Sequence, residues 1–247
     1  MRLVPSVWLR RLHKWVGLII GLQFLLWAIS GTAMALLDMD EVAGGEMAER
    51  SAAPLPATGD AWPRIQSALQ GKAATRVSVR LLHDQPTIEV ATTDGVGLFD
   101  AVSGAPIVIN GSLAANIAAA AHPSQAPVIS VQRLRELTVA VREHELPIWQ
   151  VNFRDDANSI YYVSGTTGEL LERRNDSWRW WDFFWMLHNM DYANRTSFNH
   201  PLIIMVGFAM AWLAGTGFWL LFRTMWRHDL AWLRRPQWSD RPKGSTR

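Results

Sequence analysis

Two long uncharged stretches dominate the pattern of apolar and polar residues along the chain. The first runs from Trp15 to Leu37 and the second from Pro201 to Phe222, which makes 23 and 22 residues. Each exceeds the roughly 20 residues that an α-helix needs to cross about 30 Å of hydrocarbon. Neither has the polar face that a helix of a globular domain would show. The pattern therefore predicts two transmembrane helices, one within residues 1–37 and one at 200–222.

Between these stretches the pattern changes to short alternating runs that are typical of an α+β domain. Residues 38–59 are rich in Ala, Pro, Gly and acidic side chains, which predicts a linker. Residues 60–175 contain two similar units, at about 60–110 and 128–175, each predicted as an amphipathic helix followed by antiparallel strands. The predicted helices are 60–72 and 130–143, and the predicted strands are 76–82, 87–92, 148–154 and 159–163.

The two units end alike, with a small or hydroxyl-bearing residue followed by glycine. These pairs are Ser103-Gly104 and Thr167-Gly168. Glycine there supplies the positive φ that a tight turn needs. Each unit alone is too small to bury its apolar face well, so we expect the two to pack together. An Ala-rich helix at 113–121 is predicted between them.

Residues 176–199 have a different, strongly aromatic composition. Four Trp and two Phe fall within residues 178–185, interrupted by Arg179 and Asp182. Indole rings are most stable in the headgroup zone of a bilayer, with the apolar body inward and the N–H toward water. The composition therefore predicts an interfacial helix, followed by a turn into the second span.

Charge is distributed unevenly around the two spans. The first 14 residues hold four basic side chains and no acid, and residues 223–247 hold seven basic and two acidic ones. The segment between the spans holds 20 of the 22 acidic side chains. Because basic flanks stay in the cytoplasm, we expect a bacterial inner-membrane protein with both termini cytoplasmic and a periplasmic central domain. The basic ends indicate contact with lipid headgroups and not with nucleic acid.

The start of the chain also permits a second interpretation. A basic segment, an apolar stretch and Ala33-Met34-Ala35 resemble a signal peptide with its cleavage site. An uncut anchor is favoured because the apolar stretch is longer than that of a usual signal peptide. The central domain lies outside the cytoplasm under either interpretation.

The chain contains no cysteine, and this narrows the possible chemistry. Disulfides, iron–sulfur clusters and the covalent haem of c-type cytochromes all require cysteine. Any haem would be held non-covalently. The sequence also shows no Ser/His/Asp order, no phosphate-binding loop and no His-Glu-x-x-His pattern, so hydrolytic catalysis has no visible support.

Seven histidines remain as candidate ligands, and four of them lie near the predicted membrane edges: His13, His188, His200 and His228. The other three, His83, His122 and His144, are scattered through the central domain, and we expect ordinary surface roles for them. His13 shares a helix face with Gly17 and Gly21. This face indicates either a helix-packing surface behind a histidine at the membrane edge, or an axial haem ligand above a groove that admits the porphyrin.

An antiparallel hairpin of the two spans would pair these histidines. With Leu37 level with Pro201, His13 lies level with residue 225 and close to His228, while His188 and His200 lie at the other edge. The pairs are then about 36 Å apart, which is too far for one metal site and suits two haem groups. Neutral imidazole is the usual nitrogen ligand of haem iron. Two helices enclose a haem poorly, so we expect a homodimer or a membrane redox partner.

Several segments together resemble the PepSY-associated transmembrane family. The first span contributes Leu12-His13-Lys-Trp-Val-Gly-Leu18 and Trp27-Ala-Ile-Ser-Gly31. The aromatic segment and second span contribute Leu187-His188-Asn-Met-Asp-Tyr192 and Asn199-His200. The unit ends Asp100-Ala-Val-Ser-Gly104 and Thr167-Gly168 resemble PepSY repeats. The resemblance covers nearly the whole chain.

The resemblance implies both a fold and a function. It implies a periplasmic PepSY fold, in which a helix packs on an antiparallel sheet. It also implies an association with iron acquisition, because some members are b-haem proteins that reduce ferric siderophores or carry electrons across the inner membrane. His13, His188 and His200 match histidine positions of the family. Larger members have more membrane helices than the two expected here.

Two functions follow as expectations. The first is a haem b-binding electron-transfer protein or ferric reductase-like enzyme, with His13, His188 and His200 as axial ligands, His228 as a further candidate, and a ferric siderophore or periplasmic redox protein as acceptor. The second is a non-enzymatic PepSY module that is anchored in the membrane and binds or regulates a periplasmic partner.

Overall fold

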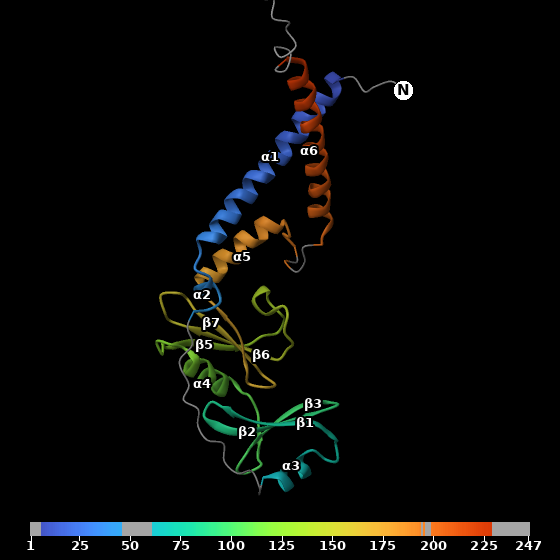
Figure 1. The fold of residues 1–247 in the computed structure, drawn as a ribbon. Coiled ribbons are helices and arrows are strands. Elements are labelled where there is room, and N and C mark those ends of the chain that lie inside the picture. Colours follow the sequence, from blue (N-terminus) through green and yellow to red (C-terminus); the bar gives the residue numbers. More distant parts are fainter. Residues whose placement is uncertain (1–5, 46–60, 194, 196–198, 229–247) are drawn as a thin grey trace, which may run out of the picture. The chain divides into compact units, whose positions relative to one another are not determined.

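The structure, a computed structural model, describes residues 6–45, 61–193, 195 and 199–228 of the chain. These fall into two compact units. The membrane unit comprises residues 1–31 and 186–247, and the central unit comprises residues 32–185. Figure 1 gives the order of the helices and strands along the chain.

Two long helices form most of the membrane unit. They are α1 (Ser6–Leu36) and α6 (Pro201–His228). Hardly any of their apolar surface is covered by protein: 11% of the most apolar stretch is buried in α1, and none in α6. Apolar helices of this length with exposed surfaces fit a lipid environment, so the prediction of two membrane helices is confirmed. Within this unit Gly17 of α1 packs against Leu213 of α6.

The first half of the central unit is a helix on an antiparallel meander. Helix α3 (Trp62–Ala68) precedes strands β1 (Ala74–Leu82), β2 (Gln85–Thr92), β3 (Gly95–Asp100) and β4 (Pro106–Ile107), which pair in sequence order. One face of the sheet is covered by α3. A cluster of buried apolar residues joins the two: Ala61, Ile65, Ile88, Val90, Phe99 and Ala101.

The second half repeats this plan with α4 (Gly111–Ala121) and a second meander. Its strands are β5 (Val128–Arg133), β6 (Ile148–Phe153), β7 (Ile160–Ser164) and β8 (Leu170–Arg174). The side chain of Asn110 caps α4 by accepting a hydrogen bond from Leu113 N at 2.9 Å. The two helix-plus-sheet units confirm the predicted fold class.

The predicted helix at 130–143 is wrong. Residues 128–133 form β5, which pairs with β6, and only Val139–Val141 makes a short 3₁₀ helix, η1. The helix that covers the second sheet is α4, which confirms the Ala-rich helix predicted at 113–121 but gives it the place expected for the helix at 130–143. Val131 and Leu134 have helical spacing, but pairing with β6 satisfies their backbone groups; Leu134 N donates to Ile148 O at 2.9 Å.

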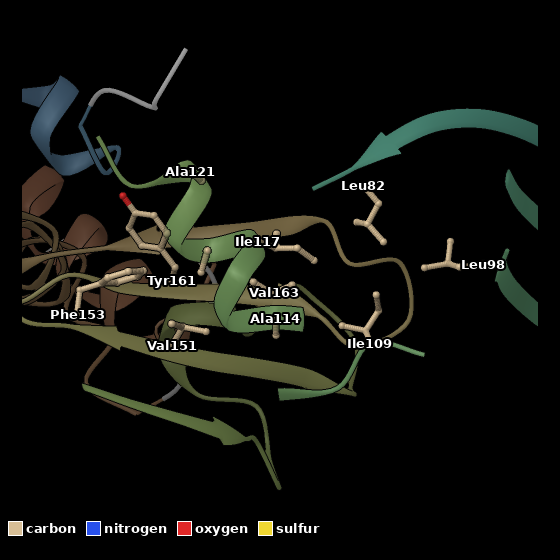
Figure 2. Packing of buried hydrophobic residues seen from close by; sticks show 11 residues of the cluster. Leu82, Leu98, Ile109, Ala114, Ile117, Ala121, Val151, Phe153, Tyr161 and Val163 are labelled. Atoms are coloured by element: carbon tan, nitrogen blue, oxygen red, sulfur yellow. The ribbon is translucent and has the colours of Figure 1, made fainter. Parts of the chain in front are cut away.

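The core of the central unit joins both halves. Figure 2 shows Ala114, Ile117 and Ala121 of α4 above side chains of β6 and β7, with Leu82 and Leu98 of the first sheet at the other end of the cluster. Arg80 of β1 also donates a hydrogen bond to the carbonyl of Thr167 in the second half. The two halves of the central unit therefore share a core, as expected from the small size of each half.

The glycine turns that end the two halves of the central unit are alike. Gly104 and Gly168 both have φ of 70°, which confirms the predicted role of glycine there. Both also sit under packed groups, because a Cβ at Gly104 would lie 2.7 Å from Ala61 O and one at Gly168 2.8 Å from Leu82 Cδ1. The turns thus require glycine for its backbone and for its size.

The start of the predicted linker is ordered onto the second sheet. Helix α2 (Met39–Val42) follows α1, and Arg173 of β8 donates to the carbonyl of Gly45 at 2.7 Å. Asn175 donates to the carbonyl of Glu41 at 2.6 Å, just before α5 (Asp176–Asn189) begins. Residues 46–59 of the predicted linker lie outside the described part of the chain.

Candidate functional site

His13 lies against the opposite membrane helix. It is on α1, and its Nδ1 lies 2.8 Å from Thr216 Oγ1 of α6. Its ring is tilted against Trp212, with ring centroids 6.5 Å apart. A Cβ at Gly217 would lie 3.4 Å from His13 Cε1, so the imidazole rests directly on the glycine backbone.

His188 has closely similar surroundings. It is near the end of α5, and its Nδ1 lies 3.1 Å from Ser30 Oγ of α1. Its ring faces Trp27 at a centroid distance of 6.2 Å. A Cβ at Gly31 would lie 3.4 Å from His188 Cε1. Each histidine is therefore held by a hydroxyl, a tryptophan and a glycine of a different helix.

The hydroxyl groups determine which ring nitrogen carries the hydrogen. Ser30 Oγ lies 2.7 Å from Leu26 O, and Thr216 Oγ1 lies 2.9 Å from Trp212 O. A carbonyl oxygen only accepts, so each hydroxyl donates its single hydrogen to its own helix. Toward the imidazole the hydroxyl must then accept, which places the ring hydrogen on Nδ1.

The consequence is the same for His13 and His188. A neutral ring with its hydrogen on Nδ1 has its lone pair on Nε2. Neither Nε2 has a hydrogen-bond partner among the described residues. Both rings are thus fixed through one nitrogen and can bind a metal through the other, the arrangement found in many metal-binding histidines.

The two histidine sites lie far apart along α1. His13 and Ser30 are separated by 17 residues, about 26 Å along a helix. No cluster of three or more potential metal-ligating side chains occurs among the residues that the structure covers. The sites are therefore two separate single-histidine sites, each of which would need a further ligand from elsewhere.

The predicted position of His13 along the second membrane helix is wrong by about nine residues. His13 lies beside residue 216 of α6, and not beside residue 225. The hairpin register assumed that the ends of the two spans are level, but the last turns of α1 contact α5 through His188. His228 is 12 residues beyond Thr216, about 18 Å along α6, so one chain does not bring it to His13. The side chain of His228 lies outside the described residues.

His200, the remaining candidate, is engaged through Nε2. This atom lies 2.7 Å from the carbonyl oxygen of Asn189, the residue after His188. Because a carbonyl only accepts, Nε2 of His200 is a donor here. The structure thus brings His188 and His200 to neighbouring positions, but His200 has Nδ1 as its free nitrogen.

Two further polar groups on α1 lack partners. Gln23 Nε2 and Trp27 Nε1 are buried, and neither has a hydrogen-bond partner in the described part of the chain. Buried unpaired donors are costly in an apolar environment. Haem has carboxylate oxygens that accept hydrogen bonds and iron that binds imidazole. The free ring nitrogens and the unpaired donors therefore fit haem in their chemistry.

One of the three histidines of the central unit differs from the expected surface role. His122 is buried, with 3% of its surface exposed, so the prediction is wrong for this residue. Its Nε2 lies 3.0 Å from Asp155 Oδ2, and its ring packs on Phe153 and Tyr161. His144 pairs with Glu172 at 2.9 Å. These contacts give both residues structural roles.

The two hydroxyl residues were not predicted as partners of the histidines, although the sequence contains a signal for them. In both spans a hydroxyl residue directly precedes a glycine and follows a tryptophan by about one helical turn. The residues are Ser30-Gly31 after Trp27 and Thr216-Gly217 after Trp212.

Comparison with known proteins identifies a family. Residues 10–243 match the family described as PepSY-associated TM region. No curated protein and no solved structure matches the chain.

Proposed function

The chain belongs to the family of PepSY-associated TM regions, and from this membership and its two histidine sites we propose that it is a b-haem-binding membrane protein that transfers electrons. The observation that carries the proposal is the shared state of His13 and His188. Each imidazole is anchored through Nδ1 and presents an unengaged Nε2. Ionisable side chains in membrane segments are rare and commonly functional, which further supports the proposal.

Histidine, hydroxyl and glycine residues would have different roles in binding haem. His13 and His188 would bind iron through Nε2, and Thr216 and Ser30 would hold the rings in orientation. Gly217 and Gly31 allow each ring to lie close to the neighbouring backbone. Haem, when bound, would supply reversible one-electron chemistry at its iron. Each site supplies one anchored histidine, so the second ligand would come from His200, from another copy of the chain or from a partner.

The direction of transfer follows from the charge pattern. The basic flanks favour an inner-membrane protein with cytoplasmic termini and a periplasmic central unit. The two sites, about 26 Å apart along α1, would then lie toward opposite faces of the bilayer. Electrons would pass outward to a periplasmic acceptor, such as a ferric siderophore or a redox protein.

An absorption spectrum tests this proposal directly. The full chain is purified in mild detergent from haem-replete cells and reduced with dithionite. We expect a b-type α band, and we expect His13→Ala and His188→Ala each to lower the haem content per chain by about half. His144→Ala is the matched control, because His144 pairs with Glu172 in the central unit. A colourless wild-type protein contradicts the proposal.

A colourless protein would favour the second function, a membrane-anchored binding module. One observation supports it. Strand β1 is an edge of the first sheet and exposes Val77 and Val79, at 46% and 38% of their surface. An unpaired, partly apolar edge can add a strand from a partner.

A further inference from the structure

A cavity of about 190 Å³ lies in the central unit. It is bounded by η1, by β8 and by the first turns of α5. Charged and aromatic side chains line much of it: Arg142, Glu143, Glu172, Arg174, Trp178, Trp181 and Asp182. By volume it would hold several water molecules or one small anionic group.

Arg142 lines this cavity and carries an unpaired donor. Its Nη1 is buried and has no hydrogen-bond partner among the described residues. An arginine is always charged, and burying its N–H groups without acceptors is unfavourable. The cavity therefore contains a cationic donor that needs an acceptor.

Three of the other charged groups of the cavity are already engaged, and the fourth, Glu143, is exposed. Glu172 pairs with Arg174 at 2.8 Å and with His144 at 2.9 Å. Arg174 also donates to Ala140 O and lies over the ring of Trp178 at 4.4 Å. Asp182 is buried and has a partner of its own. Two of the three acids are thus engaged, and no ion pair of Arg142 is found among the described residues.

We propose that this cavity binds an oxyanion, a phosphate or carboxylate group, with Arg142 as its principal donor. A guanidinium group matches the geometry of both anions and binds them through charge-assisted hydrogen bonds. The same chemistry could come from a free anion or from the headgroup of an anionic phospholipid. The proposal does not depend on haem, because none of these residues belongs to the histidine sites.

Thermal unfolding of the full chain in detergent tests the site, with inorganic phosphate compared with chloride at equal ionic strength. We expect phosphate to raise Tm in a saturable way for the wild type. Arg142→Gln should weaken the apparent phosphate affinity about tenfold or more, since it removes a charged hydrogen bond. In phosphate-free buffer the variant should be at least as stable as the wild type, because it loses an unpaired buried donor.

Arg154→Gln is the matched control, because Arg154 is exposed and does not line the cavity. It should respond to phosphate as the wild type does. The proposal is overturned if Arg142→Gln retains the full response, or if it lowers Tm equally with and without phosphate, since Arg142 would then be structural.

Native mass spectrometry with phosphatidylglycerol distinguishes the two sources. Retention of this lipid by the wild type and its loss in Arg142→Gln, without any response to inorganic phosphate, assigns the site to a headgroup. A response to inorganic phosphate shows that a free anion is sufficient. If neither probe binds, the cavity holds only water and the proposal is wrong.

Discussion

Ser30 and Thr216 show how one hydroxyl can set the state of a distant histidine. Each donates to a carbonyl of its own helix and accepts from an imidazole on another helix. The acceptor leaves the ring hydrogen on Nδ1 and the lone pair on Nε2. A hydroxyl is a weak acceptor, so its influence on the ring is mainly one of position and tautomer.

Removing either hydroxyl should release its histidine. Thr216→Val keeps the shape of the side chain, and Ser30→Ala removes one atom. We expect each to lose about 1 kcal/mol of hydrogen bonding, which for a one-electron couple sets an upper limit of about 40 mV on the shift in the midpoint potential of bound haem. Independently of haem, ¹⁵N NMR should show His13 or His188 leaving the state with hydrogen on Nδ1.

Thr216→Ser is the control, because it keeps the hydroxyl. If Thr216→Val and Thr216→Ser give the same imidazole spectrum, the hydroxyl does not determine the tautomer.

At the scale of elements, hydropathy predicted the membrane helices better than the second half of the central unit. The long uncharged stretches give α1 and α6 directly, since lipid imposes their length. Val131, Leu134, Leu137 and Val141 have helical spacing, yet Val128–Arg133 is a strand. The backbone pairing of this segment depends on β6, whose paired residues lie 16 to 25 positions later, and local spacing carries no information about it.

In the candidate site, too, some features could be predicted from the local sequence and others depend on residues far away in the chain. Histidines can be found in the sequence by type and place, but their partners depend on how helices are aligned. The contact of His13 with Thr216 spans 203 positions, and a hairpin with level ends put it nine residues away. The tryptophan, hydroxyl and glycine pattern repeated in both spans could have indicated the partners.

Asp155 ties the end of α4 to the turn between β6 and β7, and it makes the stability of this element depend on pH. Burial raises the pKa of Asp155, but hydrogen bonds from Ser159 and His122 outweigh burial and hold the pKa below its ordinary 3.8. A lowered pKa in the folded state stabilises above the unfolded pKa, and this stabilisation is lost as pH falls through the folded value.

Asp155→Asn should therefore lower the free energy of unfolding by about 1–2 kcal/mol at pH 7. The difference from the wild type should shrink as the pH falls below 3.8 and through the lowered pKa of the folded state, where the wild-type carboxyl becomes protonated. Thermal unfolding of the full chain from pH 7 to pH 3 measures this. The neighbouring Asp156 is exposed, so Asp156→Asn should change little. Equal effects of the two substitutions would contradict the role of Asp155.

For the whole molecule, orientation in the membrane is the main prediction. The chain lacks cysteine, so single substitutions report on one position each. Thr93→Cys, in the turn between β2 and β3, should react with an impermeant maleimide in spheroplasts. Ser245→Cys, in the basic tail, should react only after the membrane is permeabilised. The reverse pattern would place the central unit in the cytoplasm and would exclude a periplasmic acceptor.

The link between Ser30 and His188 also has a consequence for biogenesis. The two residues are 158 positions apart, so a nascent chain inserts Ser30 in the bilayer long before His188 is synthesised. The entire central unit must be translated in the interval. A chain released early, before α5 is complete, would contain α1 and most of the central unit. It would lack both the contact of His188 with Ser30 and the contact of His13 with Thr216. Both histidine–hydroxyl contacts can therefore form only after α6 has also been synthesised.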